Sequence, residues 1–189
     1  MTVTDVIIVL AVALLVGVYV SWRAGRIDRL HGRVDMARAA LDAALLRRSS
    51  VAFELASSGL LDPATSVLLA GAVHEVREGE RGRAGDRETG RPRDLAESDL
   101  TKALRAAFSQ PDFHQSLSGK DGADELLAEV EAAAHQVFLA RKFYNDAVSA
   151  TRVARRRPLS RVLRLAGKAA IPVYFEMDDS LVEKALPPA

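Results

Sequence analysis

The sequence predicts an all-α protein in which an N-terminal transmembrane helix continues into an antiparallel bundle of three or four helices, with long first and last helices. One uncharged apolar run stands near the N-terminus. Apolar residues make up 49% of the chain and aromatic residues only 5%, and the abundance of Ala, Leu and Val favours closely packed helices over a β-sandwich. Two further long segments repeat apolar residues at alternating steps of three and four, which is typical of packed helices.

The apolar run covers residues 6–22 and reads VIIVLAVALLVGVYVSW, without a charge. As a helix it would be about 26 Å long, close to the hydrocarbon thickness of a bilayer. Tyr19 and Trp22 fall where interfacial aromatic residues usually lie. A secretory signal peptide would begin with basic residues and end in a small-residue cleavage site, which this segment lacks, and a buried core helix would be shorter. We therefore expect residues 1–25 to form a membrane anchor with a span at about 6–22.

Charge predicts the orientation of this anchor. Arg23, Arg26, Arg29 and Arg33 follow the apolar run, and no Lys or Arg precedes it. Basic residues concentrate on the cytoplasmic side of membrane proteins. We expect a single-pass protein of the cell membrane with its N-terminus outside and its helical domain in the cytoplasm.

The helical domain is expected at residues 26–171, followed by an extended tail at 172–189. Its first helix should continue from the anchor to about Ser58, with Gly59 just beyond the helix end. Residues 79–94 are rich in glycine and in charges of both signs and predict a flexible surface loop. The other expected helices are a second opened by Asp62-Pro63 and ending near Gly79, a third from about Leu95 to Phe108, and a last one starting after Gly122.

Three segments, together with the single N-terminal span, resemble the LemA family. They are VDMARAALDAALLRR at 34–48, ARKFYNDAV at 140–148 and VYFEMDD at 173–179. The resemblance implies a membrane-anchored bacterial protein with an antiparallel helical bundle, and it implies family motifs of unknown role at Tyr144, Asn145, Tyr174, Phe175 and Glu176. The chain departs from the family pattern at Phe53-Glu54-Leu55 and lacks the Phe-Pro that usually follows the Tyr-Asn motif. The family implies no settled biochemical activity.

A basic segment near the C-terminus is a candidate contact with lipid or with a partner. Between Ala147 and Phe175 the chain contains seven basic residues and no acidic one. The segment could be an amphipathic helix on an anionic membrane surface or the closing helix of the bundle with a solvated basic side. We do not expect nucleic acid, because aromatic residues are not interleaved with the charges. The candidate contact residues are Arg155, Arg156, Arg157, Arg161, Arg164 and Lys168.

The sequence shows no catalytic constellation, and we expect no catalytic residue, metal or cofactor. Cysteine is absent, which excludes thiol nucleophiles, disulfides and Cys-ligated metals. No two of the four histidines lie three or four residues apart, the spacing of a helical His–His metal pair. Tyr144 could be a buried tyrosine that needs one hydrogen-bond partner, or it could mark a partner or ligand site together with Asn145.

These observations predict a membrane-anchored protein that serves as a protein-interaction or scaffold module. Its partners would be the membrane and an unidentified protein, and self-association stays open. Two alternatives are a subunit of an enzyme complex whose site another chain completes, and a structural rod that contacts anionic lipid through its basic C-terminal helix.

Overall fold

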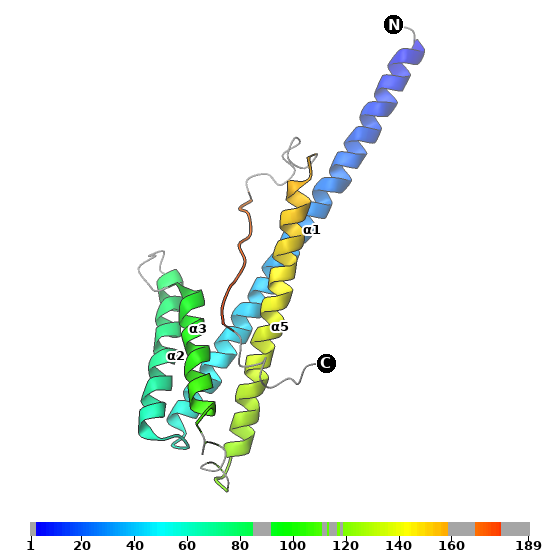
Figure 1. Cartoon of the computed structure of the whole chain (residues 1–189). Helices are drawn as coiled ribbons and strands as arrows, with labels where there is room; N and C mark the ends of the chain where they lie inside the picture. Colours follow the sequence, from blue (N-terminus) through cyan, green and yellow to red (C-terminus); the bar gives the residue numbers. More distant parts are fainter. Residues whose placement is uncertain are drawn as a thin grey trace. The chain divides into compact units, whose positions relative to one another are not determined.

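The structure, a computed structural model, describes residues 3–84, 92–110, 113, 117, 119–158 and 169–178, with side chains left aside at 81–84. Within these ranges the chain is helical and contains no strand, which confirms the predicted helical class. The described residues form four helices, which are labelled in Figure 1. They are α1 (Val3–Ser57), α2 (Pro63–Ala84), α3 (Arg93–Phe108) and α5 (Ala123–Arg156).

The turn between α1 and α2 follows the predicted capping signals. Gly59 has a φ of 73°, a left-handed conformation that glycine adopts without a steric penalty. Asp62 then caps α2, because its Oδ1 accepts hydrogen bonds from the backbone N–H groups of Ala64 and Thr65 at 3.0 and 3.1 Å. Pro63 occupies the first helical position, where its missing N–H costs nothing.

The second and third helices extend further than predicted. Gly79 does not end α2, which continues to Ala84, and α3 begins at Arg93 rather than near Leu95. The predicted loop at 79–94 is thus partly helical, and its central residues 85–91 lie outside the described part of the chain. The last helix begins at Ala123 as predicted, directly after Gly122, whose φ is 74°.

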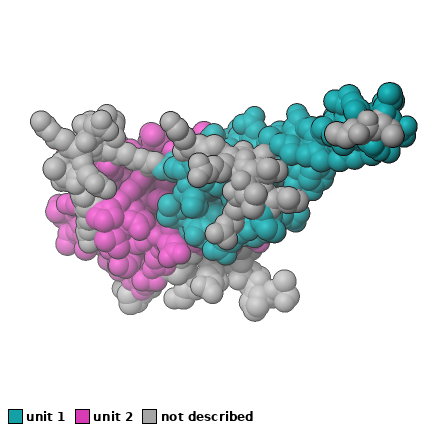
Figure 2. Space-filling model, turned by 90° about the horizontal axis from the view of Figure 1, so that it is seen from above, with its two compact units in different colours: residues 1–38, 143–174 teal, residues 39–142, 175–189 magenta. Residues whose placement is uncertain are grey.

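The chain divides into two compact units, which Figure 2 shows in different colours. Unit 1 comprises residues 1–38 and 143–174, and unit 2 comprises residues 39–142 and 175–189. Helices α1 and α5 each contribute to both units.

Unit 2 is built around an apolar core that all four helices supply. Leu55 of α1, Leu69 of α2, Leu100 and Leu104 of α3 and Val130 of α5 are almost fully buried in it. A smaller cluster forms around Phe113, whose ring lies 5.1 Å from that of Phe108 between centroids. Small residues complete the main core and allow the helices to approach closely: Ala52, Ala56, Ala96 and Ala103.

Unit 1 buries the positions that the spacing of three and four residues singles out on α1 and α5. Ile27 and Val34 of α1 are buried, as are Tyr144 and Ala147 of α5. Thr151, which is fully buried, donates its hydroxyl to the carbonyl oxygen of Ala147 at 2.8 Å and lies 3.4 Å from that of Leu30. The predicted apolar periodicity therefore describes the buried faces of both helices.

Candidate functional site

The first part of α1 exposes its apolar side chains. An 18-residue window of this helix has a mean hydropathy of 2.6, and none of the window is buried. The side chains of Ile7 and Leu14 are 60% and 69% exposed. Tyr19 and Trp22 lie at the end of the run with ring centroids 6.4 Å apart. This helix is the one candidate for a membrane span that the described residues contain, by length and composition, and a signal sequence would meet the same criteria.

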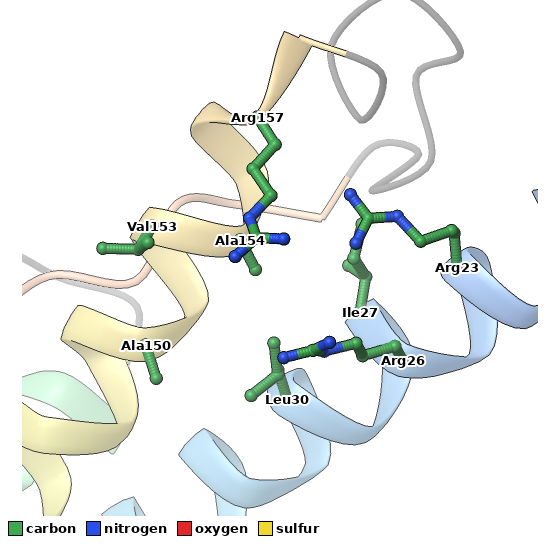
Figure 3. A pocket seen from close by; sticks show the side chains of 8 residues that line it. All are labelled: Arg23, Arg26, Ile27, Leu30, Ala150, Val153, Ala154 and Arg157. Carbon is green, nitrogen blue, oxygen red and sulfur yellow. The ribbon is translucent and has the colours of Figure 1, made fainter.

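Directly after the apolar run, unit 1 contains a cavity of about 220 Å³ between α1 and α5. Three arginines line it: Arg23 and Arg26 from α1, and Arg157, which follows the last residue of α5. Figure 3 shows the guanidinium groups of Arg23 and Arg26 extending from α1 toward α5. The rest of the lining is apolar and includes Ile27, Leu30, Val153 and Ala154.

The motif residue Tyr144 holds the C-terminal segment of unit 1. Its ring is buried, and its hydroxyl donates a hydrogen bond of 2.8 Å to the carbonyl oxygen of Val173. The structure thus brings together two motif segments that lie far apart in the sequence. Asn145 is half-buried beside Tyr144. Tyr174 is exposed on one side, and the guanidinium of Arg152 lies 5.2 Å from its ring centroid.

Arg155 also binds the C-terminal segment of unit 1. Its Nη1 and Nη2 donate hydrogen bonds of 2.8 Å to the carbonyl oxygens of Ala170 and Ala169. Nη1 also lies 3.3 Å from Nε2 of His31. Arg156 and Arg157 are exposed at the end of α5. The other predicted contact residues lie outside the described residues: Arg161, Arg164 and Lys168.

The remaining motif residues belong to unit 2. Phe175 is half-buried and Glu176 is exposed. Met177 is buried, and the backbone N–H of Asp178 donates a hydrogen bond of 3.1 Å to Oγ of Ser98 on α3. The hydrogen bond to Ser98 ties residues 175–178, a segment without helix or strand, to α3.

Unit 2 also contains a buried ion pair that sequence reasoning missed. Nη2 of Arg48 lies 2.6 Å from Oε2 of Glu97, and both side chains are almost fully buried. Arg48 further donates to the hydroxyl of Thr101 and to the carbonyl oxygen of Glu97. Burial raises the pKa of Glu97 above its ordinary value, and the charge of Arg48 opposes this rise.

A second arginine extends the pair toward the surface. Arg93 forms ion pairs with Asp42 at 2.6 Å and with Glu80 at 3.0 Å, and its Nε lies 3.7 Å from Oε1 of Glu97. That Oε1 is buried without a hydrogen-bond partner, as is Nε of Arg48. The geometry fits a structural cluster that selects one packing of α1 against α3. Among the described residues, no group of three or more His, Asp or Glu side chains is placed to hold a metal ion.

A sequence signal for the ion pair did exist. Arg48 follows Leu41 and Ala44 at the apolar spacing of α1, and Glu97 lies three residues before Leu100 on α3. Opposite charges at core positions of two helices are the expected pattern of a buried pair. The cavity left no such signal, because its lining combines residues more than 120 positions apart. No family model, curated protein or solved structure matches this sequence.

Proposed function

We propose that the chain is a single-pass membrane protein whose cytoplasmic antiparallel helical bundle serves as an interaction or scaffold module of the LemA type. The exposure of the apolar run in α1 carries this proposal. A water-soluble protein rarely leaves so many contiguous large apolar side chains uncovered, and lipid would cover them. The arginines that follow the run favour a cytoplasmic domain.

Two observations support the rest of the proposal. The hydrogen bond from Tyr144 to the carbonyl oxygen of Val173 joins residues from two of the segments that resemble the LemA family, which supports this part of the proposal. On α1 in unit 2, Leu46 and Phe53 lie seven residues apart, so they share a helix face, and both are exposed. These apolar side chains suit contact with a protein partner.

Membrane extraction and protease accessibility test the anchor and its orientation. We expect the full-length chain to stay in the membrane pellet at alkaline pH, with its N-terminal run intact by mass spectrometry. A protease added outside intact cells should spare the helical domain and should cut it after lysis. Release of the uncut chain by alkali would refute the anchor. Cleavage of the domain in intact cells would refute the orientation.

Site-specific photocrosslinking tests the interaction role. A photoreactive residue at Phe53 or Leu46 should give a defined adduct in intact membranes. The same residue at Phe143 serves as the control, because Phe143 lies in unit 1 and is more exposed, at 65% against 44% for Phe53 and 54% for Leu46. Absence of any adduct from Leu46 and Phe53, or equal adducts from all three positions, would contradict a specific partner surface on α1.

A further inference from the structure

Positive charge gathers around the cavity in unit 1. Arg23, Arg26 and Arg157 line it together, and within the described residues no ion pair joins any of them to an acidic side chain. Nε of Arg23 is buried and has no hydrogen-bond partner there. Like charges at close range repel, although the negative end of the α5 helix dipole offsets part of this repulsion. An anion in the cavity would relieve the rest.

The shape of the site favours a phosphate group attached to an apolar tail. Guanidinium groups present planar pairs of N–H donors that match phosphate oxygens. Ile27, Leu30 and Val153 line the same cavity and offer apolar surface beside the charges. Its volume of about 220 Å³ is small for a whole ligand, since ligand pockets usually measure about 300 to 1,000 Å³, and it suits a phosphate group with the atoms next to it.

The position of the site favours a lipid as the source of that phosphate. Arg23 follows the apolar run directly, and Arg26 lies about 4.5 Å further along the helix axis. In a chain anchored by residues 6–22, both side chains would lie at the depth of the lipid headgroups. Basic pockets at this depth between helices bind anionic headgroups.

We propose that this cavity binds the headgroup phosphate of an anionic phospholipid from the leaflet in which the helix is anchored. The proposal rests on the proposed membrane anchor and adds to it a built site for one lipid. It differs from attraction of the basic C-terminal segment to a charged surface, because it needs a specific arrangement of guanidinium groups on α1 and α5.

Native mass spectrometry of the full-length protein, released from nanodiscs of mixed phosphatidylglycerol and phosphatidylcholine, tests the proposal. We expect one phosphatidylglycerol to be retained in preference to phosphatidylcholine. The double variant Arg23→Gln, Arg26→Gln should lower this preference about thirtyfold, since each basic side chain near an anionic surface contributes a factor of about five. Helix content by circular dichroism checks that the variants fold.

Two control variants separate a built site from diffuse charge. Arg23→Lys, Arg26→Lys keeps the charge at the same depth but loses the planar fork, so it should lower the preference by several-fold. Arg29→Gln, Arg33→Gln removes the same charge from α1 outside the cavity lining and should lower the preference only a few-fold, because neither side chain lines the cavity and only their diffuse attraction to the headgroups is lost.

The outcomes distinguish this proposal from its premise. A lysine variant equal to the native protein, or a loss as large in the Arg29, Arg33 variant, would overturn the lipid site. Displacement of the lipid by inorganic phosphate at equal concentration would show a site for free phosphate instead and would also overturn it. If alkali extracts the chain from the membrane, the proposed membrane anchor is wrong. If it stays anchored and shows no lipid preference, the lipid site alone fails.

Discussion

At the scale of single residues, the most informative feature is a charge pair placed where the sequence pattern calls for apolar residues. Arg48 and Glu97 are fully desolvated and hold each other at 2.6 Å. The desolvation of a buried pair costs about as much as its attraction returns, so the pair adds little net stability over apolar residues. Removing one partner is different, because the other charge then stays buried without compensation.

We predict that Arg48→Ala lowers the free energy of unfolding by about 3 to 5 kcal/mol. The double variant Arg48→Met, Glu97→Leu should recover most of this loss, because it replaces both charges with apolar volume. Urea unfolding of the full chain in detergent, followed by circular dichroism, measures both. Lys102→Ala is the control. It removes a half-exposed pair with Asp99 at 2.9 Å and should cost less than about 1 kcal/mol. A similar small loss for Arg48→Ala would contradict the buried pair.

The raised pKa of Glu97 predicts a specific dependence of stability on pH. Burial raises the pKa in the folded protein above the ordinary 4.5, so the folded state holds this proton over a range in which the unfolded chain has lost it. The contribution of Glu97 to stability is therefore complete below pH 4.5 and falls as pH rises through the folded pKa. The free energy of unfolding of the native chain, minus that of Glu97→Gln, should decrease with pH in this window. An increase would mean that Arg48 dominates and lowers the pKa instead.

At the scale of helices, the sequence predicts the features that depend on apolar periodicity and on local capping residues. The apolar spacing of α1 and α5 identified their buried faces, and the Gly59 and Asp62-Pro63 signals located the end of α1 and the start of α2. The predicted end of α2 near Gly79 is about five residues too early, because α2 continues to Ala84. Gly79 is a poor helix former, but Glu80 of the next turn forms an ion pair with Arg93, which itself is bound by Asp42. Such tertiary contacts outweigh local propensity and leave no trace in a single segment of sequence.

The start of α2 gives a prediction at this scale. Asp62 accepts hydrogen bonds from the side chain of Thr65, from the backbone N–H of Thr65 and from the backbone N–H of Ala64. These hydrogen bonds, in that order of importance, hold the pKa of Asp62 below its ordinary 3.8. Asp62→Ala should lower the melting temperature at pH 7, and Asp62→Asn, which can still accept the backbone hydrogen bonds, should lower it less. Because the folded pKa is lowered, the advantage of Asp62 over Ala should shrink as pH falls below 3.8. An unchanged difference at pH 3 in thermal unfolding would contradict a charged cap.

For the molecule as a whole, the membrane proposals depend on what covers the apolar run of α1. Residues 6–22 contain eleven Leu, Ile and Val residues, and each favours the bilayer by about 0.3 to 0.6 kcal/mol, which gives about 3 to 7 kcal/mol for the run. One arginine at the centre of a span costs about 2.5 to 3.5 kcal/mol. A single substitution would leave insertion in balance, whereas two should abolish it.

We therefore predict that Leu10→Arg, Leu14→Arg moves the chain from the membrane pellet to the soluble or aggregated fraction after alkaline extraction. Met36→Arg provides the matched control, because Met36 is 68% exposed against 69% for Leu14 and lies on the same helix beyond the run. It adds the same type of charge and should leave the chain in the pellet. If the double variant also stays in the pellet, the run is not held by lipid. A protein surface must then cover it, and the arginines of the cavity would lie away from any headgroup.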